Sequence, residues 1–116
     1  MKVLALIYAD ETAWDTADEG EREKVYEQYR AFGEAAGSKI LGGAELAPTR
    51  TATTVRIRDG QTLVTDGPFA ETKEQLGGFY LLDCANLDEA VQLAARIPGA
   101  ARGAVEVRAS HEEEQP

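Results

Sequence analysis

The sequence contains few of the residues on which cross-links and many catalytic mechanisms depend. Its one cysteine, Cys84, excludes a disulfide within the chain. Its one histidine, His111, stands in a charged C-terminal stretch, so we expect no histidine-dependent catalysis in the folded domain. No apolar run reaches the roughly 18 residues of a membrane span, and the run at 3–8 is too short for a secretory signal. These absences predict a cytoplasmic protein.

Positive charge is also scarce. The 116 residues include 12 basic and 21 acidic side chains, which give a formal net charge of −9. Residues 10–27 hold eight acids and two bases, and residues 112–114 add three acids, so these two segments account for the whole excess. Because an acidic surface repels phosphate backbones and anionic lipids, the sequence predicts neither a nucleic-acid partner nor a membrane partner.

The first half of the chain has the periodicity of a strand, a helix and a second strand. The apolar run at 2–8 is typical of a buried strand. A capping box at Thr16–Glu19 predicts the start of a helix that ends near Ala36, before the C-capping Gly37. The residues of its apolar stripe are Val25, Tyr29, Phe32 and Ala36. Residues 39–47 follow as a glycine-interrupted strand.

The second half begins with a hairpin. Residues 51–58 alternate in polarity, and Asp59-Gly60 is a strong hairpin signal before the return strand 62–65. We expect one helical turn at 70–75 and a strand at 77–84. Beyond these, the pattern predicts a helix from the capping Asn86 to Ile97, with a stripe of Leu87, Ala90, Val91, Ala94 and Ile97, and a last strand at 103–108.

This order of elements predicts one α+β domain over residues 1–109, followed by an acidic, flexible tail at 110–116. Two amphipathic helices must lie on one face of the antiparallel sheet to bury their stripes, which gives a ferredoxin-like sandwich. The other sheet face is also apolar, because either the Val3, Ala5 and Ile7 set or the Leu4, Leu6 and Tyr8 set must lie on it. An exposed apolar face of that size is typical of an interface, so we expect a homodimer that packs sheet against sheet.

The stretch DGPFAETKEQLGGFY at residues 66–80 resembles the signature of the DGPF-domain family, which is part of the YCII-related proteins. The resemblance extends over about residues 2–108 and implies a dimeric α+β barrel. Some members stand near extracytoplasmic-function sigma factors, which implies a regulatory role. Other YCII-related proteins resemble small lyases or dehalogenases that use a histidine–aspartate pair. This chain has no histidine before His111, so only the aspartate half can be carried over.

Asp66 and Lys73 are the candidate catalytic residues within this signature. A carboxylate kept ionised by a neighbouring ammonium can act as a general base. The alternative is that the motif is a structural turn, in which Gly67 and Pro68 set the backbone and Phe69 fills the core. Both interpretations remain open at this point.

Five side chains are candidates for contact with a substrate: Tyr8, Trp14, Phe69, Glu71 and Tyr80. The two tyrosines can instead be interface packing with satisfied hydroxyls. No spacing of His, Cys, Asp or Glu defines a metal site, and no phosphate loop or dinucleotide motif is present, so we expect neither metal nor cofactor.

Two functions follow from these residues. The first is binding of a small polar or aromatic molecule in a pocket near the signature loop, with cofactor-free acid/base chemistry of the lyase or isomerase type. The second is a non-catalytic module that docks a sigma factor through the acidic segment 10–27. The first is favoured, because runs of acids are usually solubilising surface.

Overall fold

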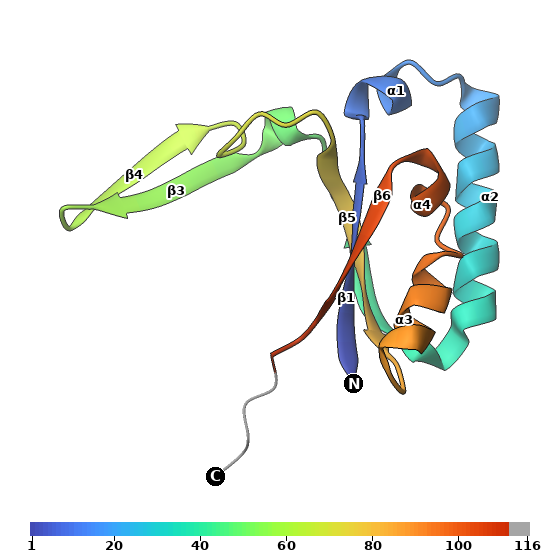
Figure 1. Cartoon of the computed structure of the whole chain (residues 1–116). Helices are drawn as coiled ribbons and strands as arrows, with labels where there is room; N and C mark the ends of the chain where they lie inside the picture. The colour runs from blue at the N-terminus through green and yellow to red at the C-terminus, as the bar shows by residue number, and fades with distance from the viewer. Residues whose placement is uncertain (112–116) are drawn as a thin grey trace, which may run out of the picture.

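A computed structural model describes residues 1–111 of the chain (Figure 1). The strands are β1 (Lys2–Ala9), β2 (Ile40–Glu45), β3 (Thr53–Arg58), β4 (Gln61–Asp66), β5 (Gln75–Asp83) and β6 (Ala104–Ala109). The α-helices are α1 (Glu11–Asp15), α2 (Glu19–Ala36), α3 (Leu87–Ala94) and α4 (Gly99–Arg102), and 3-10 turns lie at Gly37–Lys39 and Thr49–Thr51. The strands and the helices α2 and α3 follow the predicted order, whereas α1 and α4 were not predicted and α3 ends before the expected Ile97. The acidic tail from Glu112 on lies outside the described residues.

Four strands form an antiparallel sheet in the order β2-β5-β1-β6, and the helices cover one of its faces (Figure 1). This is the α+β sandwich with a ferredoxin-like arrangement that the pattern predicted. The two central strands, β1 and β5, pair from Lys2 opposite Asp83 to Ala9 opposite Gln75, with a bulge between Ile7 and Tyr8.

The register of β1 decides which side chains face the helices. Val3 and Ala5 are fully buried under the helices, and Ile7 packs against the same core. Leu4, Leu6 and Tyr8 therefore lie on the opposite, open face. On β5, Leu81 and Phe79 pair with Leu4 and Leu6 and share that face. The open face is apolar, as predicted, and all five of these side chains are partly accessible.

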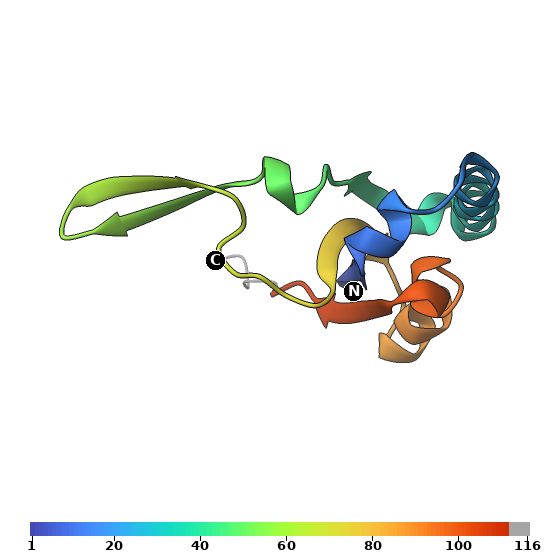
Figure 2. The same cartoon turned by 90° about the horizontal axis from the view of Figure 1, so that it is seen from above.

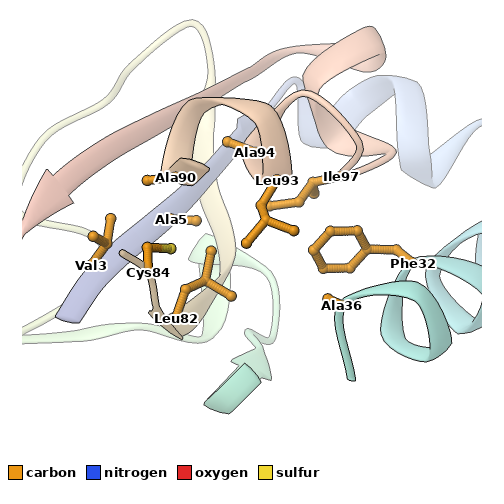
Figure 3. Packing of buried hydrophobic residues seen from close by; sticks show 10 residues of the cluster. All are labelled: Val3, Ala5, Phe32, Ala36, Leu82, Cys84, Ala90, Leu93, Ala94 and Ile97. Atoms are coloured by element: carbon orange, nitrogen blue, oxygen red, sulfur yellow. The ribbon is translucent and has the colours of Figure 1, made fainter. Parts of the chain in front are cut away.

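Small and branched side chains form the core between the sheet and the helices (Figure 3). Phe32 and Ala36 of α2 approach Leu82 of β5, and Ala90 and Leu93 of α3 close the other side. In α2 the predicted stripe is confirmed, with Val25, Phe32 and Ala36 buried. In the predicted stripe of α3 and the residues after it, Ala90, Ala94 and Ile97 are buried as expected. The prediction was wrong for Leu87 and Val91, which are exposed, while Leu93 is buried.

Local polar contacts explain two further differences from the prediction. The first is at the start of α2, where the N-cap is Asp18 and not Thr16, because the Asp18 carboxylate accepts a hydrogen bond from the Glu21 amide at 2.8 Å. The second is α1, which replaces the expected irregular connection and begins where Asp10 caps the Thr12 amide.

No helical turn forms within residues 70–75. That segment is irregular until β5 begins at Gln75. Just before this strand, the Thr72 hydroxyl donates a hydrogen bond to the Glu74 carbonyl. Phe69 is 77% exposed and does not fill the core of its own chain.

The hairpin of β3 and β4 stands apart from the sheet. Among the described strands, β3 and β4 pair only with each other. The hairpin projects on the side of the sheet away from α2 and α3 (Figures 1 and 2). Asp59 and Gly60 at its tip have φ of 51° and 76°, the left-handed pair that the Asp-Gly signal predicts. The radius of gyration is 16.4 Å, against about 13 Å expected for a compact domain of this length.

Within the described part of the chain, no helix is long and apolar enough to cross a membrane.

Replacing Leu82 by Ala tests the core. Leu82 is fully buried, so the Leu82→Ala change leaves a cavity, and we expect it to lower the free energy of unfolding by about 2–5 kcal/mol. Leu87 is 57% exposed, so Leu87→Ala is the matched control and should cost much less. Urea denaturation measures both values, and equal losses would contradict this assignment of the core.

Candidate functional site

A half-open pocket of about 520 Å³ lies on the helix-covered side of the sheet. Its walls come from the ends of β1 and β2, the start of β5, and the helices α1, α2 and α4. Helix α1 lies across one end of the space between the sheet and α2 (Figures 1 and 2). The volume falls within the range of sites for small organic molecules, and most of the lining is apolar.

Glycines let two of the walls approach each other closely. A Cβ atom on Gly43 of β2 would lie 2.5 Å from the Phe79 carbonyl oxygen, and one on Gly78 would lie 2.9 Å from the Ala44 carbonyl oxygen. Both glycines line the pocket. A larger side chain at either position would push β2 and β5 apart. The two glycines therefore keep these strands paired where they border the pocket.

Aromatic rings form one wall of the pocket. The rings of Trp14 and Tyr26 meet edge to face, with centroids 5.6 Å apart. The guanidinium of Arg102 lies 5.5 Å from the centroid of the Trp14 ring and also lines the pocket. Arg22 fixes this wall, because its guanidinium donates hydrogen bonds to the Trp14 carbonyl at 3.0 Å and to the Asp15 carbonyl at 2.9 Å.

Two further tyrosines, Tyr29 and Tyr80, also line the pocket. Tyr80 of β5 packs against Phe32, with ring centroids 5.1 Å apart, and Tyr29 projects from α2 toward Gly99. Burial raises the pKa of both Tyr29 and Tyr80 above the ordinary value of 10.0. Both phenols therefore stay protonated at neutral pH and can donate a hydrogen bond to a ligand oxygen.

The carboxylates of the pocket differ in how far they are engaged. Glu11 accepts hydrogen bonds from the amide and the hydroxyl of Thr49, at 2.8 and 2.7 Å. Asp10 caps α1, and Asp15 lies 3.9 Å from Arg50. Glu45 accepts only a long 3.3 Å bond from the Tyr26 hydroxyl, so of these four it is the one most available to a ligand.

The structure brings two of the residues predicted from the sequence into this pocket, Trp14 and Tyr80. Tyr8 lies on the open face of the sheet, opposite Leu76, and therefore faces away from Tyr80. Asp66 ends β4, and Phe69, Glu71 and Lys73 follow it in an exposed segment that lines no part of this pocket. Asp66 and Lys73 form no ion pair within residues 1–111.

Sequence reasoning missed most polar and aromatic residues of the pocket, among them Tyr26, Tyr29, Glu45 and Arg102. For Tyr29 a signal was present, because it places a hydroxyl in an otherwise apolar stripe of α2. Nothing local marked the other three, which meet only when α2, β2 and α4 assemble. In the part of the chain that the structure describes, no group of three or more His, Cys, Asp or Glu side chains is placed to hold a metal ion.

Comparison with known proteins identifies relatives over nearly the whole chain. A family model described as the YCII-related domain matches residues 1–112. An uncharacterised protein of Rhizobium meliloti (strain 1021) is 44% identical over 114 residues, which cover 93% of this chain and 90% of the relative.

One solved structure is similar over almost its full length: 5-chloro-2-hydroxyhydroquinone dehydrochlorinase from Burkholderia phenoliruptrix AC1100, in complex with 2,5-dihydroxybenzoquinone. The TM-score is 0.55 at 16% identity, and the match covers 97% of this chain and 96% of the other. At this identity the likeness shows the fold alone, which is an α+β fold with helices on one face of an antiparallel sheet.

The tyrosines of the pocket predict how stability depends on pH. A phenol whose pKa is higher in the folded than in the unfolded chain stabilises the fold below pH 10 and loses that contribution as the pH rises. We therefore expect the free energy of unfolding to fall above about pH 10, and to fall less in Tyr80→Phe. Urea denaturation across this range measures the effect, and an identical decline in both proteins would contradict it.

Proposed function

The chain belongs to the YCII-related family, and on this premise we propose that it binds a small aromatic molecule carrying polar substituents. The observation that carries the proposal is the pocket of about 520 Å³ that joins an aromatic wall to two protonated tyrosine hydroxyls. The bound molecule contacts the Trp14 wall with its flat face. Its oxygen substituents accept hydrogen bonds from Tyr29 and Tyr80.

The ligand of the similar solved structure supports this class of molecule. That enzyme holds 2,5-dihydroxybenzoquinone, a flat ring with four oxygen substituents. A ring of this size is well within the volume of the pocket. Arg102, beside Trp14, favours a ligand that carries negative charge, as an ionised phenol or an enolate does.

Cofactor-free acid/base chemistry of the lyase type is the reaction that these groups can support. A carboxylate at Glu45 accepts a proton from the ligand, while a tyrosine hydroxyl stabilises the oxygen that gains negative charge. Asp66, with Lys73 as its electrostatic partner and Phe69 and Glu71 beside the substrate, is the second proposal for the base. That proposal requires the exposed segment 66–74 to meet the ligand, which a single chain does not provide.

Self-association and cellular location complete the proposal. The open apolar face of Leu4, Leu6, Tyr8, Phe79 and Leu81 supports a homodimer that packs sheet against sheet. The lack of a possible disulfide supports a cytoplasmic location. The sigma-factor alternative gains no support from the descriptions of the matched proteins.

Ligand binding can be followed with the single tryptophan, because Trp14 lies in the pocket wall. We expect 2,5-dihydroxybenzoquinone to quench Trp14 fluorescence to saturation, and Tyr80→Phe to weaken the affinity about three- to tenfold through loss of one hydrogen bond. Tyr8→Phe is the matched control, since Tyr8 lies on the other sheet face, and it should leave the affinity unchanged. If neither this compound nor related hydroxylated rings give a saturable signal, the pocket does not have the proposed function.

The identity of the base is decided by two isosteric variants. With a substrate found among halogenated hydroquinones, we expect Glu45→Gln to lower kcat by 10²-fold or more, about the usual contribution of a general base. Asp66→Asn should leave kcat near the wild-type value. The reverse result would assign the base to Asp66. Circular dichroism of both variants confirms that the fold is retained.

A further inference from the structure

The hairpin of β3 and β4, with the closing residues on either side, forms an arm over residues 52–67. The Gly67 amide donates to the Ala52 carbonyl at 2.7 Å, and the Thr54 hydroxyl donates to the Gly67 carbonyl at 2.8 Å, so the base of the arm is fixed. Beyond this base the two strands pair only with each other. A two-stranded ribbon of this kind is at best marginally stable in water without a surface to cover it.

The arm has one apolar face. Val55 lies directly opposite Val64, and Ile57 lies two residues farther along on the same side. Val55 is 61% exposed, and Val64 and Ile57 are each 64% exposed. The other face carries mainly polar groups, among them Thr54, Arg56, Arg58 and Gln61, together with Leu63. Within residues 1–111, one face of the ribbon is therefore left without an apolar partner.

The position of the arm points to what covers that face. It projects from the sheet on the open side, away from the helices, in both views (Figures 1 and 2). Each strand has six residues, which span about 20 Å, whereas two sheets packed face to face lie about 10 Å apart. A second copy of the protein stacked on the open face therefore lies alongside the arm. The arm is long enough to reach past the sheet of that second copy.

We propose that the arm docks on a second copy of this chain, with Val55, Ile57 and Val64 buried against that copy beyond its sheet. The inference rests on the homodimer of the proposed function and adds a reciprocal pair of arms to the contact between the open faces. One assembly then covers both the apolar face of the arm and the apolar open face of the sheet.

The charge of the arm agrees with a copy of the same chain as its partner. Residues 53–66 carry Arg56 and Arg58 against Asp59 and Asp66, so the paired strands have no net charge. A nucleic acid or another strongly charged partner requires a surface of opposite sign.

Adjacent residues on opposite faces of β4 supply a matched pair of variants. Val64→Glu places a charge on the apolar face, and we expect it to raise the dimer dissociation constant by about a hundredfold or more. Leu63→Glu places the same charge opposite Arg56 on the other face and should leave the dissociation constant within about threefold of wild type. Sedimentation of each protein over a concentration series measures both. Equal dissociation constants for the two variants would overturn the inference.

Cross-linking in the otherwise unchanged chain tests the contact without depending on a destabilised variant. A photoreactive benzoylphenylalanine replaces Ile57, or Arg58 on the polar face as the control, and chains labelled with 14N and 15N are mixed before irradiation. We expect adducts between differently labelled chains from position 57 and far fewer from position 58. Adducts confined to one chain would overturn the inference.

The outcomes for the arm and for the pocket can be told apart. If the dimer persists in Val64→Glu and 2,5-dihydroxybenzoquinone still quenches Trp14 normally, the arm contact is contradicted while the proposed ligand binding is supported. If position 57 gives cross-chain adducts but Trp14 is not quenched, the proposed ligand binding is contradicted while the arm contact is supported.

Discussion

The alternation of side chains along β1 is the constraint on which the rest of the structure depends. With β1 held between β5 and β6, Val3 and Ala5 must lie under the helices while Leu4 and Leu6 face away. A shift of one residue would exchange the two sets and expose the core. The same pairing therefore creates both the packed side that contains the pocket and the apolar side that is left open.

The pocket depends on this arrangement at one end of the sheet. β1 leads directly into the Asp10 cap, which begins α1 and places Trp14 beside α2. Glycines in β2 and β5 keep the neighbouring strands close, and Arg22 ties the backbone of α1 to α2. Each of these features depends on neighbouring residues alone. They form a single concave site because the pairing of β1 with β5 and β6 brings their elements together.

Much of the fold was predictable because its signals are local or periodic. The hairpin turn at Asp59-Gly60, the cap at Asn86 and the stripe of α2 need only neighbouring residues, and all three are confirmed. Trp14 and Tyr80 were also identified as candidates. The start of α2 was misplaced because both Thr16 and Asp18 are good capping residues, and only the fold shows which carboxylate or hydroxyl reaches an amide.

Most of the pocket could not be predicted, for a physical reason. Tyr26, Glu45 and Arg102 come from three separate elements, and no spacing in the sequence links them. The signature at 66–80 is distinctive, yet Asp66, Glu71 and Lys73 lie on an exposed segment outside the pocket of their own chain, and only its end at 75–80 contributes to the lining. This segment connects the base of the arm, where the Gly67 amide donates to the Ala52 carbonyl, to the start of β5.

The central claim is that the ligand binds between the aromatic wall and the tyrosines on the helix-covered side of the sheet. Amide chemical shifts of the 15N-labelled protein, titrated with 2,5-dihydroxybenzoquinone, test it most directly because each glycine of the pocket reports separately. The account predicts saturable shifts that centre on Gly43, Gly77, Gly78 and Gly99, with little change at the arm tip Gly60. Shifts that instead centre on residues 66–74, or on the open face at Leu4 and Leu6, would contradict it.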